Sequence, residues 1–286
     1  MAKTEVTIKE LLESGAHFGH QRCRWNPKMK RFVFEERNGI YIIDLAKTLQ
    51  QIRSAVEVVT ETVASSKSVL FVGTKKQAKE VMRECAERCG EFYVCERWLG
   101  GMLTNLSTIR KSVKKLERIE KKIVNSAEGL TKKELLNLSK DQVKLERNLS
   151  GIRGMRKPPG LLIVVDPSRE AIAVAEANKL GIPVMALVDT NCDPDPIDYV
   201  IACNDDALKS IKLIVDALAE AIKEKKDELY IESGKEPEEK PVEFVVATEE
   251  VVALPTVEEE AVKEERLDEL PATEELIIET ESTGRK

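Results

Sequence analysis

Several features that mark other classes of protein are absent from this 286-residue chain. No apolar run reaches the length of a membrane-spanning helix, and the start, MAKTEVTIKE, lacks the apolar core of a signal peptide. Six cysteines in a chain of this length do not make a disulfide framework. None of them has C-x-x-C spacing, so we expect reduced structural thiols rather than a zinc site. These absences favour a cytoplasmic protein without a membrane partner.

The usual catalytic and cofactor-binding signatures are missing as well. No G-x-G-x-x-G follows a predicted strand, and the segment FVGTKK at residues 71–76 lacks the spacing of a phosphate-binding loop. Both histidines, His17 and His20, fall in one glycine-flanked segment with no adjacent nucleophile. We therefore predict no catalytic residue, no cofactor and no enzyme activity. The alternative that stays open is a cytosolic α/β enzyme that binds a nucleotide or a phosphorylated ligand.

Charge is distributed unevenly along the chain. The whole sequence has 45 basic and 51 acidic residues, a net charge of −6. Residues 232–286 contain 18 of the acids and 6 of the bases, which leaves 33 acids and 39 bases, a net charge of +6, over residues 1–231. A basic body of this kind suits a nucleic-acid partner. The acidic tail has almost no aromatic residues and is predicted to be disordered.

The stretch from residue 160 to residue 207 predicts a parallel β-sheet. Three short apolar runs, 161–165, 183–188 and 199–203, lack the polar alternation of a half-solvated strand, and this suits strands buried on both faces. A helical pattern between the first two places Ile172, Ala173, Ala177 and Leu180 on one side and ends at Gly181. Two further strand-and-helix units precede this stretch, so we expect about five parallel strands.

Other local patterns complete the predicted α/β domain, which is assigned to residues 1–103 and 154–231. Thr7 and Glu10 fit a capping box, and Asn38-Gly39 between two apolar runs predicts a β-hairpin. Asp44 is expected to cap a long core-facing helix. A strand at residues 69–72 is followed at Gly73-Thr74 by the next predicted helix. The last helix is expected to run from about Leu208 to Tyr230, with Leu208, Ile211, Val215, Leu218 and Ile222 facing inward.

Residues 104–153 are predicted to form an insertion of two helices. Apolar residues follow a heptad-like register on both sides of a break at Glu128-Gly129, and Thr131 with Glu134 fits a second capping box. The seam consists of Leu106, Ile109, Val113, Leu116 and Ile123 on the first helix, and Leu135, Leu138, Leu145, Leu149 and Ile152 on the second. This pattern indicates an antiparallel coiled-coil hairpin. Its outer faces are basic, with 12 Lys and Arg against 6 acids between residues 104 and 150.

Four groups of residues are predicted to contact RNA, because cations neutralise phosphates and flat side chains stack on unpaired bases. They lie in the segment 22–31, in the Arg97-Trp98 segment, at the predicted helix start after Thr74, and on the basic hairpin. The predicted RNA-binding residues are Arg22, Arg24, Trp25, Lys28, Lys30, Arg31, Lys75, Lys76, Arg97, Trp98, Arg110, Lys111 and Lys114. The alternatives are core packing for the tryptophans and simple solvation for the cations.

The carboxyl edge of the predicted sheet is acidic, and phosphate would be repelled there. The residues predicted to dock another protein are Asp189, Asp193, Asp205 and Asp206. Helix caps and proline-stiffened turns are the simpler explanation. A further alternative is a divalent ion shared between His20 and these carboxylates, since imidazole and carboxylate suit zinc. That alternative requires the fold to bring residue 20 to this edge, so our assignment includes no metal.

Several segments together resemble the bacterial family of the second protein of the small ribosomal subunit. They are GAHFGHQRCRWNPKMKRFVFEERNGIYIIDLAKT, LFVGTKKQA, RWLGGMLTN, GLLIVVDPSRE and ANKLGIPVMALVDTNCDPDPIDYVIACNDDA, in that order. The resemblance covers about residues 5–228 and excludes the acidic tail. It implies a flavodoxin-like sheet domain with an inserted coiled coil. It also implies a structural protein of the small subunit, with 16S ribosomal RNA and the OB-repeat ribosomal protein that captures messenger RNA as partners.

Overall fold

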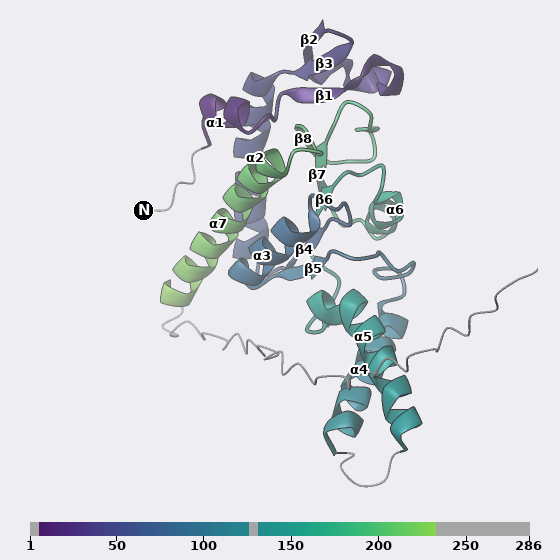
Figure 1. The fold of residues 1–286 in the computed structure, drawn as a ribbon. Coiled ribbons are helices and arrows are strands. Elements are labelled where there is room, and N and C mark those ends of the chain that lie inside the picture. The colour runs from purple at the N-terminus through teal and green to yellow at the C-terminus, as the bar shows by residue number, and fades with distance from the viewer. Residues whose placement is uncertain (1–5, 126–130, 233–286) are drawn as a thin grey trace, which may run out of the picture. The chain divides into compact units, whose positions relative to one another are not determined.

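The computed structural model describes residues 6–125 and 131–232 (Figure 1). Its central element is a five-stranded parallel sheet with the order β5-β4-β6-β7-β8. The strands are β4 (Val69–Val72), β5 (Phe92–Val94), β6 (Leu161–Val165), β7 (Val184–Val188) and β8 (Tyr199–Ala202). Counted along the chain, this is the 2-1-3-4-5 order of flavodoxin-like sheets. The predicted set of about five parallel strands is confirmed.

The strands are continuously apolar because both faces of the sheet are covered. On β6, Leu161, Ile163 and Val165 belong to one hydrophobic cluster. Leu162 and Val164 belong to the other. Successive side chains of a strand point to opposite faces, so each strand supplies both clusters.

Helices lie on both sides of this sheet (Figure 1). One face is covered by α1 (Ile8–Glu13), α2 (Leu45–Ala64), α3 (Lys79–Cys89) and α7 (Leu208–Glu232), and the other by α6 (Ala171–Lys179). Asp44 caps α2 as predicted, since its Oδ1 accepts a hydrogen bond from the Ala46 amide at 3.0 Å. No helix of residues 6–125 and 131–232 has the length and apolar character to span a membrane.

Three predicted details of these helices are wrong. On α6 the buried side is formed by Ala173, Val174 and Ala177, whereas Ile172 is 60% exposed and Leu180 is exposed as well. Glu176, which is 8% exposed, also lies on the buried side of this helix. Leu208, at the start of α7, is also exposed, although the other four predicted inward residues are buried. Helix α3 begins at Lys79, after a turn, rather than at Thr74.

A second, antiparallel sheet precedes α2. It has the order β1-β3-β2 and consists of β1 (Phe18–Gln21), β2 (Val33–Arg37) and β3 (Ile40–Ile43). Two short 3-10 helices, η1 (Arg22–Arg24) and η2 (Pro27–Phe32), connect β1 to β2. The predicted hairpin is confirmed, with positive φ at Asn38 and Gly39 (50° and 77°). The predicted capping box of Thr7 and Glu10 is also present.

Helices α4 (Leu106–Asn125) and α5 (Lys132–Leu149) pack against each other and are followed by η3 (Ser150–Ile152) (Figure 1). The capping box at Thr131 is confirmed. Ile109, Val113 and Leu149 are buried as predicted, whereas Leu135 is exposed. The break at Glu128-Gly129 lies outside the described residues, as does the acidic tail beyond residue 232. The coiled-coil hairpin and the disorder of the tail therefore stay predictions.

Candidate nucleic-acid interface

The loop between β5 and α4 is held in place by one buried carboxylate, that of Glu176 on α6. Its Oε1 accepts hydrogen bonds from the Trp98 indole at 3.1 Å and the Gly101 amide at 2.7 Å. Its Oε2 accepts from the Leu103 amide at 3.0 Å, and from the Thr104 amide and hydroxyl at 3.1 Å each. This carboxylate fixes the chain that leads into α4.

The electrostatic balance at Glu176 favours its charged form. Burial acts to raise the pKa of this carboxyl, but the hydrogen bonds from Thr104, Gly101, Trp98 and Leu103 outweigh burial, so the pKa is lowered. Trp98 itself is only 7% exposed. Its predicted role as a stacking platform for RNA is therefore wrong, because the core covers its ring. Arg97, next to it, is exposed as an RNA contact requires.

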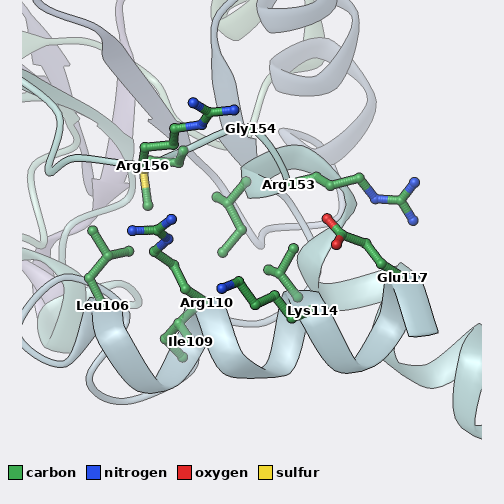
Figure 2. A pocket seen from close by; sticks show the side chains of 11 residues that line it. Leu106, Ile109, Arg110, Lys114, Glu117, Arg153, Gly154 and Arg156 are labelled. Atoms are coloured by element: carbon green, nitrogen blue, oxygen red, sulfur yellow. The ribbon is translucent and has the colours of Figure 1, made fainter. Parts of the chain in front are cut away.

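The loop leads into α4, and α4 forms one side of a basic groove (Figure 2). The groove lies between α4 and the segment 152–156 that follows α5, and it has a volume of about 330 Å³. Its apolar lining is Leu106, Ile109, Val113, Ile152 and Met155. Its charged side chains are Arg110, Lys114, Glu117, Arg153 and Arg156. Two chain segments thus bring four cations and one carboxylate to a single concave surface.

Most of the positive charge of this groove is uncompensated. Arg153 makes an ion pair with Glu120. Within residues 6–125 and 131–232, Arg110, Lys114 and Arg156 have no ion-pair partner. The predicted residues Arg110 and Lys114 are thus joined by two arginines that the sequence analysis missed. A signal for them exists in the basic, glycine-interrupted run GIRGMRK directly after the second predicted helix. Lys111 is exposed on α4 but does not line the groove.

The second predicted RNA-binding group lies on η1 and η2. All five of its cations are exposed, namely Arg22, Arg24, Lys28, Lys30 and Arg31. Lys28 is already paired, with its Nζ 2.7 Å from Asp193 and 2.5 Å from Asp195. Trp25 is half-buried and packs on Tyr41, with 4.9 Å between the ring centroids. Arg22 makes a longer contact with Glu36, at 3.9 Å, so Arg24, Lys30 and Arg31 are better placed to meet phosphate than Lys28 is.

Lys75 does not lie where the sequence analysis placed it. Because α3 begins at Lys79, Lys75 precedes the helix, and its ammonium lies 2.7 Å from Asp205 and 2.6 Å from Asp206. A phosphate contact by Lys75 is therefore wrong, since two carboxylates already hold its charge. Lys76, the neighbouring residue, is exposed.

The acidic carboxyl edge of the sheet is assembled as predicted, but half of it is buried. Asp189 and Asp205 are 1% and 0% exposed, so their predicted role in docking a protein is wrong. Burial first, and then the charge of Asp189, raise the pKa of Asp205 to about 7. Asp193 and Asp206 are exposed. Asn204 rather than either aspartate accepts the backbone hydrogen bonds before α7.

Comparison with known proteins gives matches over most of the chain. The model of a family described as ribosomal protein S2 matches residues 11–225. A protein named small ribosomal subunit protein uS2 from Protochlamydia amoebophila is 75% identical over 231 residues, which are 81% of this chain and 85% of the relative. Proteins of the same name from Chlamydia trachomatis serovar D and Chlamydia pneumoniae are 61% and 63% identical, over 88% and 80% of this chain and 89% and 82% of theirs.

Proposed function

The chain belongs to the ribosomal protein S2 family, and we propose that it binds 16S ribosomal RNA through the groove between α4 and residues 152–156. Membership in this family makes it a non-catalytic, structural protein of the small ribosomal subunit in the cytoplasm. The alternative of an α/β enzyme that binds a nucleotide is thereby set aside.

The observation that carries the RNA proposal is the uncompensated charge of the groove. Arg110, Lys114 and Arg156 face a single hollow without carboxylate partners among the described residues. Arginine guanidinium groups bind phosphate oxygens with two parallel hydrogen bonds, and lysine adds a compact positive charge. The apolar floor formed by Ile109 and Val113 keeps α4 rigid beneath these cations. A phosphate backbone lying in the groove would therefore meet several cations at once.

We assign supporting RNA contacts to the predicted cations that are exposed. They are Arg22, Arg24, Lys30, Arg31, Lys76, Arg97 and Lys111. In this proposal, residues 104–153 act as a basic coiled-coil arm, and residues 1–103 with 154–231 as the sheet domain that carries it. Both surfaces would contribute to affinity by releasing counterions from RNA.

The surface that docks the OB-repeat ribosomal protein is narrower in this proposal than the sequence suggested. Only Asp193 and Asp206 of the four predicted aspartates reach solvent. Exposed carboxylates beside basic RNA-binding loops repel phosphate and suit a basic protein surface. Charge reversal of Asp206 to Lys should release the OB-repeat protein from otherwise native small subunits while this chain stays bound. Retention of both proteins would contradict the docking assignment.

The test of the RNA proposal compares two triple variants with equal change of charge. Arg110→Ala, Lys114→Ala and Arg156→Ala together empty the groove of its unpaired cations. Lys209→Ala, Lys212→Ala and Lys223→Ala remove three exposed lysines of α7 and serve as the control. In filter binding to 16S RNA, the groove variant should lose affinity and reduce the log–log salt slope by roughly one unit for each lost phosphate contact. Equal losses in both variants would show that only net charge matters.

A further inference from the structure

A second groove lies between α5 and the residues that follow β5. It has a volume of about 550 Å³, and it shares no lining residue with the groove between α4 and residues 152–156. We call it the α5 groove. Its charged lining comes from α3, from the loop after β5 and from α5, and consists of Lys79, Glu96, Arg97, Lys140, Lys144 and Arg147.

The single carboxylate of the α5 groove holds two of its five cations. Oε2 of Glu96 lies 2.7 Å from Nζ of Lys79 and 2.7 Å from an Nη atom of Arg147. Arg97, Lys140 and Lys144 have no ion-pair partner in the part of the chain that the structure describes. The α5 groove therefore keeps three uncompensated positive charges.

Exposed aliphatic side chains lie beside these charges. Val143 lines the α5 groove and is 62% exposed, and Leu136 is 56% exposed. The two residues are seven positions apart, which is about two helical turns, so they lie on the same side of α5 with Lys140 between them. A phosphate backbone supplies charge but no aliphatic surface to cover such residues, whereas a polypeptide that is both acidic and apolar supplies both.

The chain contains a segment of that composition outside its described residues. The stretch from residue 241 to residue 262 has six glutamates and no lysine or arginine. The same stretch has seven valines, one phenylalanine and one leucine. Its charge and its apolar side chains both complement those of the α5 groove.

The length of the chain allows this segment to reach the groove. Nζ of Lys226 on α7 lies 2.5 Å from Glu91, and five residues of chain from there to Glu96 span at most about 18 Å. From Lys226 to the end of α7 at Glu232 the helix rises about 9 Å. The eight residues 233–240 can span about 26 Å or more. The linker is thus long enough for residues 241–262 to meet α5.

We propose that residues 241–262 bind in the α5 groove of the same chain. Their valines and Phe244 cover Leu136 and Val143, and their glutamates pair with the unpaired cations of the groove. Because the segment is tethered, its effective concentration is in the millimolar range, so contacts of modest strength suffice. One consequence rests on the proposed function: the tail and RNA compete for Arg97, which that function assigns to RNA.

The experiment uses the full chain, mixed in equal amounts with isotopically labelled full chain, and a carbodiimide that joins a carboxylate directly to a lysine amine. Mass spectrometry should find links within one chain from Glu243, Glu249 and Glu250 to Lys140 and Lys144. Their yield should exceed that of links to Lys111 and Lys115, exposed lysines of α4 outside both grooves, by about fivefold or more. Equal yields at the α4 lysines, or links that mainly join labelled to unlabelled chains, would overturn the proposal.

A pair of neutral substitutions tests the apolar contact without changing any charge. Leu136→Gln with Val143→Gln should lower the yield at Lys140 and Lys144 by about threefold or more. Val124→Gln, which changes an 80% exposed valine of α4, is the matched control and should leave the yield unchanged. Circular dichroism checks that each variant is folded. An unchanged yield in the double variant would overturn the proposal, and an accompanying loss of affinity for 16S RNA would assign the α5 groove to RNA instead.

Discussion

The indole nitrogen of Trp98 donates a hydrogen bond to the Glu176 carboxylate at 3.1 Å, and both side chains are buried. Residues 78 positions apart are thereby joined where the loop after β5 meets α6. This contact explains why Trp98 packs in the core rather than on RNA. It also sets the direction in which the chain enters α4 and the basic groove.

Replacing Glu176 with Gln should destabilise the fold strongly. The amide keeps one acceptor oxygen but turns an NH₂ group toward the backbone donors, so buried N–H groups lose their partners. We expect a loss of about 2–4 kcal/mol in the free energy of unfolding, measured by urea denaturation. Glu84→Gln, on the exposed side of α3, is the matched control and should change stability by less than about 0.5 kcal/mol. Equal losses of unfolding free energy in the two variants would show that the Glu176 carboxylate does not hold the loop in place.

The same carboxylate predicts a pH dependence of stability. Its pKa is lowered in the folded protein, so its contribution is fully present above the pKa of an unfolded glutamate, about 4.3. The contribution is lost as the pH falls through the lower folded pKa. The stability difference between the native chain and Glu176→Gln should therefore stay constant from pH 7 to about 5 and shrink below about pH 4. A difference that is already lost at pH 6 would contradict this assignment.

Local patterns in the sequence predicted much of the fold but not the hydrogen bonds that Glu176 accepts from the loop after β5. The five apolar strand runs, the Asn38-Gly39 turn and both capping boxes depend on neighbours in the chain, and each is confirmed. The position of Glu176 depends on hydrogen-bond donors that lie 72 to 78 residues earlier in the chain. The spacing of apolar residues along the sequence gives no sign of such distant contacts. Likewise, Lys75 looked free because its carboxylate partners follow a strand 130 residues later.

Two glycines near the groove should differ sharply in their tolerance of alanine. A Cβ on Gly151, in η3, would lie 2.2 Å from the Tyr93 carbonyl oxygen, so the backbone of β5 or η3 must shift. A Cβ on Gly154 would lie 3.4 Å from the Phe92 ring, which is an ordinary contact. We expect Gly151→Ala to cost roughly 2–4 kcal/mol of stability in thermal unfolding and Gly154→Ala less than about 1 kcal/mol. Similar costs at both positions would argue against close packing of η3 on β5.

Within the basic loop, ion pairing predicts unequal contributions to RNA binding. Arg24 and Lys30 have no ion-pair partner among the described residues, whereas Asp193 and Asp195 hold Lys28. Arg24→Ala with Lys30→Ala should weaken binding to 16S RNA by about tenfold or more and flatten the salt dependence. Lys28→Ala alone should change affinity by less than about threefold. A larger effect for Lys28 would mean that RNA displaces its two aspartates.

The acidic tail yields a prediction from sequence alone. Its 18 acids can compete with phosphate for the basic body. Deleting residues 232–286 should leave the fold intact and strengthen non-specific RNA binding at low salt. The gain should shrink at physiological ionic strength, where screening acts over about 8 Å. If the truncated chain unfolds, or binds RNA no more tightly than the full chain, the tail does not act by competing with phosphate.

In our proposal, the groove between α4 and residues 152–156 anchors this protein to the RNA of the small subunit. Its most direct measurement is a sucrose-gradient profile in moderate salt of the full chain carrying Arg110→Ala, Lys114→Ala and Arg156→Ala, beside the α7 triple variant at Lys209, Lys212 and Lys223. We predict that the groove variant stays folded but shifts to the top of the gradient, while the α7 variant migrates with small subunits. Co-migration of the folded groove variant with small subunits, at the level of the native chain, would show that the groove does not anchor this protein.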